Sequence, residues 1–243
     1  MSWHLRRVDT KANERRNRAV SAAAAQLDRL GRPGDVRLGT AEAQTIPRLS
    51  TGLVALDRAL GGGLPRGRII ELAGRRSTGR TGLACAIAAH ATQAGETIAW
   101  IDVEDALEAE TVAAAGVVLA RLLWVRPRGV CDALRAAEIL LGASGFGLVA
   151  LDVGDARSPC PPPGWPRLAR AAERSGTALL VIEPQRQAGT FAALGLEVTG
   201  RRAYWSGGPG RLVVLDGVES RVMVVRNRIG RRGQSLVLRQ AGG

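Results

Sequence analysis

The residues with the clearest chemical meaning form one short loop, which runs from Gly74 to Thr81 and has the sequence GRRSTGRT. The loop matches the phosphate-binding pattern G-x-x-x-x-G-K-[ST] at every position except one, because Arg80 stands where the pattern has lysine. In such loops the backbone amides and the lysine neutralise phosphate charge, and the final hydroxyl binds Mg²⁺. The sequence therefore predicts a nucleotide-binding loop with an altered cation, made by Gly74, Ser77, Thr78, Gly79, Arg80 and Thr81.

The elements around this loop are those that a phosphate-binding loop requires. An apolar run over 68–73 predicts a strand before it, and an alanine-rich run over 83–94 predicts a helix after it. Four further apolar runs alternate with helical patterns, which is typical of a parallel sheet covered by helices on both faces. These runs span 97–104, 122–125, 147–152 and 178–183.

The last third of the sequence predicts a different arrangement of strands. Short apolar runs alternate with turn residues from Leu196 to Leu238, and this pattern favours an antiparallel extension of the same sheet. At 243 residues the chain is long enough for one α/β domain. We expect a flexible lead over 1–12, an N-terminal helix and strand within 13–44, and the core domain over 45–243.

The composition limits the setting and the kinds of partner. The formal net charge is +12, and all but one of the 34 basic residues are arginine, which favours a nucleic acid or an acidic protein surface as partner. No apolar run is long enough to span a bilayer, and the N-terminus lacks an apolar signal core. The three cysteines are odd in number and far apart, so they predict no metal site and a reduced, cytoplasmic setting.

Several motifs occur in the same order as in the core of bacterial RecA. They are the stretch from Leu49 to Glu71 with its triple glycine, the run AWIDVEDAL at 99–107, and the run VMVVRNRI at 222–229. The similarity holds in register from about Arg18 to Leu238, so the chain resembles the RecA-like superfamily. Its short length and altered nucleotide loop are most similar to ImuA, a family of RecA-related accessory proteins of damage-induced mutagenesis in bacteria.

This resemblance assigns roles to residues outside the loop. Asp152, which ends the fourth predicted strand of the sheet, matches the aspartate that holds Mg²⁺. Glu104 matches the glutamate that activates the attacking water. Arg226 and Arg228 match the lysines of RecA that reach across the filament interface to the phosphates of a neighbour's nucleotide.

Three departures from RecA weaken the predicted nucleotide site. Arg80 places a planar fork where a compact ammonium belongs, and the two groups are not interchangeable. Arg75 and Arg76 replace a Pro-Glu pair and crowd the loop with positive charge. Pro184 stands where RecA has the glutamine that senses the γ-phosphate, and proline has no side-chain donor. Gln185 is one residue out of register with that sensing position.

These departures predict a degenerate P-loop and a pseudo-ATPase. Its retained acids, Asp152 and Glu104, would then pair with the loop arginines as an internally neutralised pocket. We expect that the chain requires no cofactor and has no metal site. Any binding of ATP and Mg²⁺ should be weak.

The two loops with which RecA holds single-stranded DNA are not retained. The first is replaced by a proline-rich, almost uncharged stretch at 158–166, and the second is cut to about Gln187–Thr190. Arginines elsewhere on the surface can contact DNA phosphates or an acidic protein, and the sequence leaves both alternatives open. We expect Trp165 and Trp205 to be packing or protein-contact residues and not platforms for base stacking.

The sequence therefore favours a non-catalytic RecA-like adaptor in the bacterial DNA-damage response. By the resemblance, it would support error-prone translesion synthesis through contacts with RecA, a Y-family-like partner and an error-prone polymerase, and it would limit RecA filaments or recombination. The helix predicted at 13–30 resembles the RecA helix that docks on a neighbouring protomer. The alternative is a DNA-dependent ATPase, a recombinase paralogue that binds single-stranded DNA.

Overall fold

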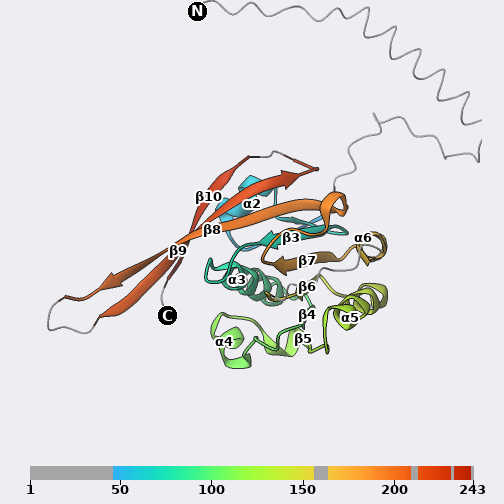
Figure 1. The fold of residues 1–243 in the computed structure, drawn as a ribbon, viewed down its shortest axis with the longest axis horizontal. Helices are drawn as coiled ribbons and strands as arrows, with labels where there is room; N and C mark the ends of the chain where they lie inside the picture. The colour runs from blue at the N-terminus through green and yellow to red at the C-terminus, as the bar shows by residue number, and fades with distance from the viewer. Residues whose placement is uncertain (1–45, 156–163, 209–212, 231–232, 242–243) are drawn as a thin grey trace, which may run out of the picture. The chain divides into compact units, whose positions relative to one another are not determined.

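Most of the described residues are organised around one eight-stranded sheet, in the strand order β10-β9-β8-β3-β7-β6-β4-β5 (Figure 1). The computed structural model describes residues 46–155, 164–208, 213–230 and 233–241. The predicted lead over 1–12 and the helix and strand predicted within 13–44 lie outside these residues. The strands of the sheet are β3 (Ile69–Ala73), β4 (Ile98–Asp102), β5 (Leu122–Val125), β6 (Leu148–Asp152), β7 (Ala178–Glu183), β8 (Ala192–Ser206), β9 (Val214–Asn227) and β10 (Ser235–Ala241).

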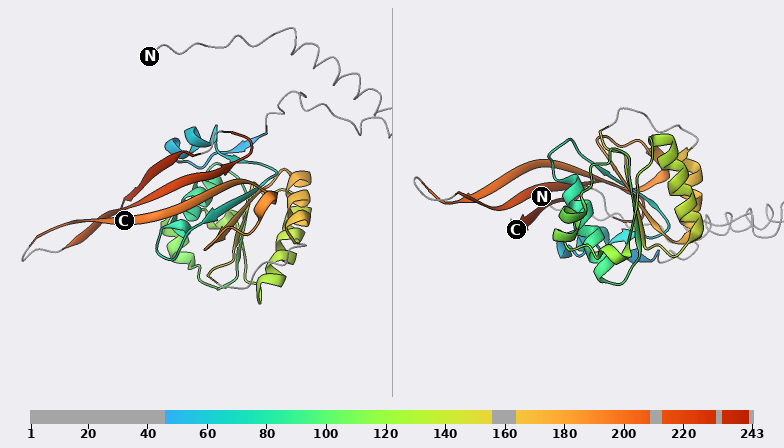
Figure 2. Two further views of the ribbon diagram at one scale, coloured as in Figure 1. Left: turned by 45° about the horizontal axis from the view of Figure 1, so that its top comes forward. Right: turned by 90° about the horizontal axis from the view of Figure 1, so that it is seen from below.

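Helices cover both faces of the parallel part of this sheet, as the apolar strands predicted (Figure 2). One core joins the sheet to α2 and α3, and the other joins it to α5 and α6. The strands in the middle are apolar on both faces because each face is buried under a helix. The helices are α2 (Val54–Leu60), α3 (Arg80–Gln93), α4 (Ala109–Ala114), α5 (Val130–Ala143) and α6 (Gly164–Ser175), with the short turns η1 (Leu119–Arg121) and η2 (Gly189–Phe191) and the small hairpin of β1 (Arg48–Leu49) and β2 (Leu64–Pro65).

The direction of the strands collects the candidate site residues at one edge. From β8 through β5, every neighbouring pair of strands is parallel, so the carboxyl ends of these strands lie at the same edge of the sheet. The phosphate-type loop follows β3, Glu104 follows β4, and Asp152 ends β6. Ligands of open α/β sheets bind at this carboxyl edge, so a functional site is expected there.

The antiparallel extension is present, but its strands are longer than the sequence indicated. Residues 192–206 and 214–227 form two long strands, and not four short ones, because β-bulges absorb residues that looked like turns. One such bulge lies between Thr199 and Arg201, where Gly200 takes a left-handed conformation with φ 64°. The strands β8 and β9 therefore continue past the helix-covered part of the sheet as a two-stranded ribbon (Figure 1).

The two segments predicted to stand in place of the DNA-binding loops of RecA differ in how far the structure describes them. Residues 156–163 are not described, and α6 already begins at Gly164, so Trp165 lies in a helix and is 4% exposed. This burial confirms the packing role expected for Trp165. Trp205, in the β8–β9 ribbon, is 61% exposed. No helix in the described part of the chain is both long and apolar enough to cross a membrane.

Candidate functional site

A cavity of about 490 Å³ lies at the carboxyl edge of the sheet, beside the first turn of α3. It is formed by the predicted loop on one side and by the ends of β4 and β6 on another, with apolar residues of α3, β9 and β10 completing the wall. The loop enters α3 through Gly79, whose φ of 94° is left-handed. Of the predicted site residues, the cavity is lined by Ser77, Gly79, Arg80, Thr81, Glu104 and Asp152.

Arg80 is the first residue of α3, and its side chain is held inside the protein. The residue is only 7% exposed. Its guanidinium donates hydrogen bonds to the carbonyl oxygen of Gly74, to that of Gly154 (3.2 Å), and to Oδ1 of Asp155 (2.7 Å). A buried guanidinium needs such acceptors because an unpaired charge inside a protein is costly. All three acceptors belong to this chain, so the cation that would bind a phosphate is already occupied.

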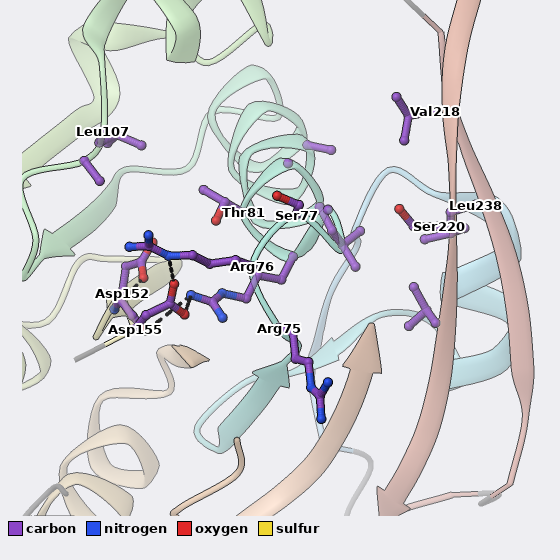
Figure 3. A pocket seen from close by; sticks show the side chains of 18 of the residues that line it. Arg75, Arg76, Ser77, Thr81, Leu107, Asp152, Asp155, Val218, Ser220 and Leu238 are labelled. Atoms are coloured by element: carbon purple, nitrogen blue, oxygen red, sulfur yellow. Dashed lines mark hydrogen bonds and ion pairs between the residues drawn. The ribbon is translucent and has the colours of Figure 1, made fainter. Parts of the chain in front are cut away.

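Asp155 lies between two arginines of the loop (Figure 3). Its Oδ1 accepts from Arg80, and its Oδ2 accepts from Arg76. Its backbone N–H donates to Oε1 of Glu104 (2.9 Å), and Arg76 also approaches Oε2 of Glu104 at 3.7 Å. Burial acts to raise the pKa of Asp155, but the hydrogen bonds from Arg80 and Arg76 outweigh it and hold that pKa below its usual value. We call Arg76, Arg80, Glu104 and Asp155 the Asp155 cluster.

The cluster differs from the neutralised pocket that the sequence predicted. Arg80 pairs with Asp155, which was not foreseen, and it makes no hydrogen bond or ion pair with Asp152 or Glu104. Glu104 instead contacts Arg76. Arg75 points away from the cluster (Figure 3). One signal could have identified Asp155: it comes three residues after the strand-terminal Asp152, at the same edge as the loop arginines.

Asp152 and Thr81 keep positions that are compatible with a magnesium site. Both line the cavity, and Thr81 is exposed to it. Oδ1 of Asp152 accepts a hydrogen bond from the backbone N–H of Gly154 (3.0 Å). Burial raises the pKa of Asp152 to about 6, with smaller contributions from Asp102 and Glu104, against the lowering effect of that hydrogen bond and of Arg80. Within the described residues, no group of three or more His, Cys, Asp or Glu side chains could hold a metal ion.

The end of β7 holds a second pair of carboxyl groups, which lies away from the cavity. Glu71 and Glu183 are fully buried on neighbouring strands, and one oxygen of each accepts from no other residue and can share a proton with the neighbouring carboxyl. Their other oxygens accept from the backbone N–H groups of Ala188 (2.6 Å) and Gln187 (3.3 Å). Burial, and then the charge of Glu71, raise the pKa of Glu183 to about 9. These carboxyls hold the shortened second loop against the sheet.

The residues that the resemblance assigned to γ-phosphate sensing and to interface contacts do not line the cavity. Pro184 and Gln185 line a different groove, beside β8. Arg226 donates to the carbonyl oxygens of Gly189 (2.5 Å) and Ala192 (3.4 Å). Arg228 donates to the carbonyl oxygen of Thr190 (2.7 Å). Both arginines therefore brace the shortened second loop of their own chain.

ATP with Mg²⁺ does not fit this arrangement as it stands. A phosphate at the loop would have to take Arg80 from three acceptors and displace the carboxylate of Asp155, which would repel it. Thr81 and Asp152 alone supply too few ligands for the metal without the phosphate oxygens that normally complete its shell. Arg80 and Glu104, which would bind phosphate and orient water, are instead held by contacts with Asp155 and Arg76.

Comparisons with known proteins agree with this fold and place the chain in a family. The family described as the RecA N-terminal domain matches residues 18–161. The chain belongs to the RecA N-terminal domain family. Protein RecA of Pseudomonas fluorescens (strain Pf0-1) is 37% identical over 142 residues, and Protein RecA of Synechocystis sp. (strain ATCC 27184 / PCC 6803 / Kazusa) is 38% identical over 138 residues.

The RecA-family match covers part of the relatives and is supported by a solved structure. The aligned residues are 58% and 56% of this chain, and the chain spans only 40% and 39% of those two RecA proteins. A crystal structure of the RadB recombinase matches with a TM-score of 0.59 and 20% identity, over 78% of this chain and 94% of that one. The RadB match shows that the two chains share a fold.

Proposed function

We propose that this RecA-family chain is a non-catalytic adaptor of the ImuA type, which acts in the bacterial DNA-damage response through protein contacts. It would support error-prone translesion synthesis by binding RecA and the translesion proteins, a Y-family-like partner and an error-prone polymerase. By binding RecA it would also limit filament growth or recombination. The observation that carries the proposal is the Asp155 cluster, in which the arginine of the nucleotide loop binds an internal carboxylate.

The Asp155 cluster supports loss of catalysis for a physical reason. Phosphoryl transfer depends almost entirely on positioning the phosphates and neutralising their charge. Arg80 donates to three acceptors of its own chain, and Glu104, the candidate for orienting water, accepts from the N–H of Asp155 and contacts Arg76. A residue bound in this way is not free to orient a water molecule or a phosphate.

Retained residues favour a second candidate, a DNA-dependent ATPase that acts as a recombinase paralogue. Thr81, Glu104 and Asp152 all line one cavity, as they would in a working enzyme. The RecA relatives share more than a third of the aligned residues with this chain. For this alternative to hold, nucleotide binding must open the Asp155 cluster.

A phosphate-release assay with the full chain, with and without single-stranded DNA, separates the two candidates. The adaptor proposal expects release at the background rate, unchanged by DNA and unchanged in the variants Asp152→Asn and Glu104→Gln. A DNA-stimulated rate that both variants abolish would establish the ATPase instead. Binding of a fluorescent ATP analogue, measured in parallel, should show no Mg²⁺-dependent affinity in the micromolar range.

The adaptor half of the proposal is tested by association with RecA filaments. We expect the full chain to co-sediment with RecA on single-stranded DNA and to shorten its filaments. Deletion of residues 1–30, which include the predicted docking helix, should abolish both effects. Unchanged association of the deletion variant would exclude this mode of docking, and no association of the full chain would exclude the RecA contact itself.

A further inference from the structure

The sheet has a gap one strand wide beyond the carboxyl end of β3. β3 lies between β7 and β8 and ends at Ala73, where the chain turns into the nucleotide-type loop. On one side the chain continues beyond β7 through Pro184 to Arg186, and on the other β8 continues to Ser206. Neighbouring strands are about 4.8 Å apart, so the walls of this gap are two strand spacings apart.

The gap is a groove with a volume of about 460 Å³, and we call it the β8 groove. One end is the outer side of the nucleotide-type loop, and the two walls come from the end of β7 and from β8. Its lining residues are Ala73, Gly74, Arg75, Thr78, Pro184, Gln185, Arg186, Glu197, Val198, Thr199 and Gly200.

One wall of the β8 groove is an open strand edge. β8 pairs with β3 only as far as Glu197, but it pairs with β9 on its other side as far as Ser206. Within the described residues, no strand pairs with the groove side of β8 from Val198 onward. Gly200 has nothing within 4 Å of the position that a Cβ atom would take, so the space beside it is open. An open edge of this kind can pair with an added strand.

The charge of the β8 groove favours an acidic occupant. Arg75 is exposed and, among the described residues, its side chain has no hydrogen bond or ion pair. Arg221 lies directly across from Thr199 on β9, is exposed, and is also without such a partner in that part of the chain. The acid of the lining, Glu197, is already paired with Arg186 at 3.3 Å. One unpaired cation therefore lines the groove, and a second lies next to it on β9.

We propose that the β8 groove binds an extended, acidic segment of a partner protein, which adds to the open edge of β8 as a strand. The backbone of β8 would supply the main-chain hydrogen bonds, and Arg75 and Arg221 would pair with carboxylates of the segment. The groove is poorly suited to single-stranded nucleic acid. None of its described lining residues is aromatic, and stacking on aromatic side chains is the usual way to hold unpaired bases.

This inference goes beyond the adaptor function and does not depend on it. Arg75 points away from the Asp155 cluster (Figure 3), and Arg221 belongs to β9. A chain that bound and hydrolysed ATP would still have the same groove. The two proposals therefore fail independently: phosphate release tests the Asp155 cluster, and peptide binding tests the β8 groove.

The test is a selection of short random peptides displayed on their messenger RNA, carried out on the immobilised full chain. Enriched peptides are resynthesised with a fluorophore, and their affinity is measured by anisotropy. We expect enrichment of Asp and Glu, and a loss of affinity of about tenfold or more in the double variant Arg75→Glu/Arg221→Glu. The matched control is Arg128→Glu, an exposed arginine of the loop after β5, at the far edge of the sheet, which should leave the affinity unchanged.

Strand addition makes a further prediction about the backbone of the selected peptide. In a strand, alternate N–H groups point to opposite edges, so only one set can face β8. N-methylation of that set should abolish binding, whereas N-methylation of the other set should leave it unchanged. Equal effects of the two sets, peptides without acidic enrichment, or equal losses in Arg128→Glu would overturn the proposal. The proposal would also be overturned if no peptide is enriched but an oligo-dT strand binds the chain and loses affinity in the double variant. Thermal unfolding of each variant checks that it folds.

Discussion

At the level of single residues, the three arginines that the resemblance to RecA predicts to bind phosphate each bind their own chain. Arg80 donates to two backbone carbonyls and a carboxylate, and Arg226 and Arg228 donate to carbonyls of the segment 189–192. A guanidinium has five N–H donors in a fixed plane, so it can bridge several oxygens at once. Each of these arginines therefore acts as an internal brace in this chain.

The first prediction concerns the ion pair of Arg80 with Asp155. Their side chains are only 9% and 22% exposed, so removal of one partner leaves a poorly solvated charge. We expect Asp155→Ala to lower the free energy of unfolding by about 2–3 kcal/mol, somewhat less than for a fully buried pair. Urea denaturation measures this change. The control is Glu138→Ala, whose pairing with Arg167 at 3.6 Å is exposed and should be worth less than about 0.5 kcal/mol.

A double-mutant cycle shows whether Asp155 acts through Arg80. Asp155→Ala and Arg80→Ala remove opposite partners of the same contact, so their effects on the free energy of unfolding should be non-additive by more than about 1 kcal/mol. Additive losses would contradict the structure, because they would mean that the two side chains stabilise the fold independently. The same variants test the nucleotide-type loop. Asp155→Ala frees Arg80 from its carboxylate and should gain affinity for nucleotide, whereas Arg80→Ala removes the cation and should not.

The second prediction concerns the buried carboxyl pair of Glu71 and Glu183. The pKa of Glu183 is raised to about 9 from 4.5, so the folded chain keeps a proton that the unfolded chain releases between these values. The contribution of this group to stability is therefore fully present below pH 4.5 and is lost as the pH rises toward 9. We expect the free energy of unfolding to fall over this window, with a slope of up to about 1.4 kcal/mol per pH unit.

Glu183→Gln supplies the control for this pH dependence. The amide keeps an oxygen that can accept from the backbone N–H of Gln187, and its NH₂ can donate to Glu71 where the carboxyl proton would otherwise lie. The variant should flatten the decline in stability toward alkaline pH, as measured by urea denaturation at a series of pH values. An equal slope in the variant and the parent chain would show that the pair does not share a proton.

At the level of elements, the junction between the loop and α3 depends on contact with β9. Gly79 takes a left-handed conformation, and a Cβ there would lie 2.6 Å from Oγ of Ser220. That hydroxyl donates to the carbonyl oxygen of Thr78 (2.9 Å) and so ties the loop to the antiparallel strands. The antiparallel extension therefore also fixes the entrance of the helix that carries Arg80.

The third prediction separates backbone strain from this contact. Gly79→Ala and Gly95→Ala both place alanine at a left-handed φ, 94° and 93°, but only the first meets a neighbour. We expect Gly95→Ala to cost about 1 kcal/mol of stability, and Gly79→Ala about 1 kcal/mol more because the bond from Ser220 is displaced. In a Ser220→Ala background the two glycine variants should cost the same. A persistent difference there would assign the excess to something other than Ser220.

Helices and strands could be predicted from the sequence wherever a periodic pattern of apolar residues determines them. Contacts between residues far apart in the chain could not, because only the folded structure brings those residues together. Buried strands such as β6 are apolar up to the terminal aspartate, so their existence and the parallel sheet followed directly. The length of β8 did not, because bulges at Gly200 and elsewhere let a strand continue through residues that usually turn. The role of Asp155 was missed because its partners, Arg76 and Arg80, are more than seventy residues away in the chain.

At the level of the whole molecule, the net charge of +12 is not gathered into a phosphate-binding track on the described core. The arginines predicted to meet phosphate, Arg80, Arg226 and Arg228, contact a carboxylate or carbonyls of the same chain. The exposed arginines without a hydrogen bond or ion pair among the described residues are spread over several elements, with Arg170 and Arg174 together on α6. They include Arg58, Arg75, Arg128, Arg170, Arg174 and Arg221. Nine of the 34 basic residues precede residue 46.

The last prediction is that DNA binding by the full chain is weak and comes mainly from residues 1–45. Each phosphate contact adds about 0.9 to the slope of log affinity against log salt, so dispersed arginines predict a shallow dependence, no steeper than about −4. Filter binding to duplex and single-stranded DNA over a range of salt measures this slope. Residues 46–243 form one compact unit and should retain a slope of about −2 or less when residues 1–45 are deleted. A slope of about −6 that survives the deletion would instead reveal a continuous phosphate-binding surface on the core. Such a surface would favour a DNA-binding recombinase paralogue over an adaptor, because it would supply a DNA contact without the two loops that RecA is expected to use.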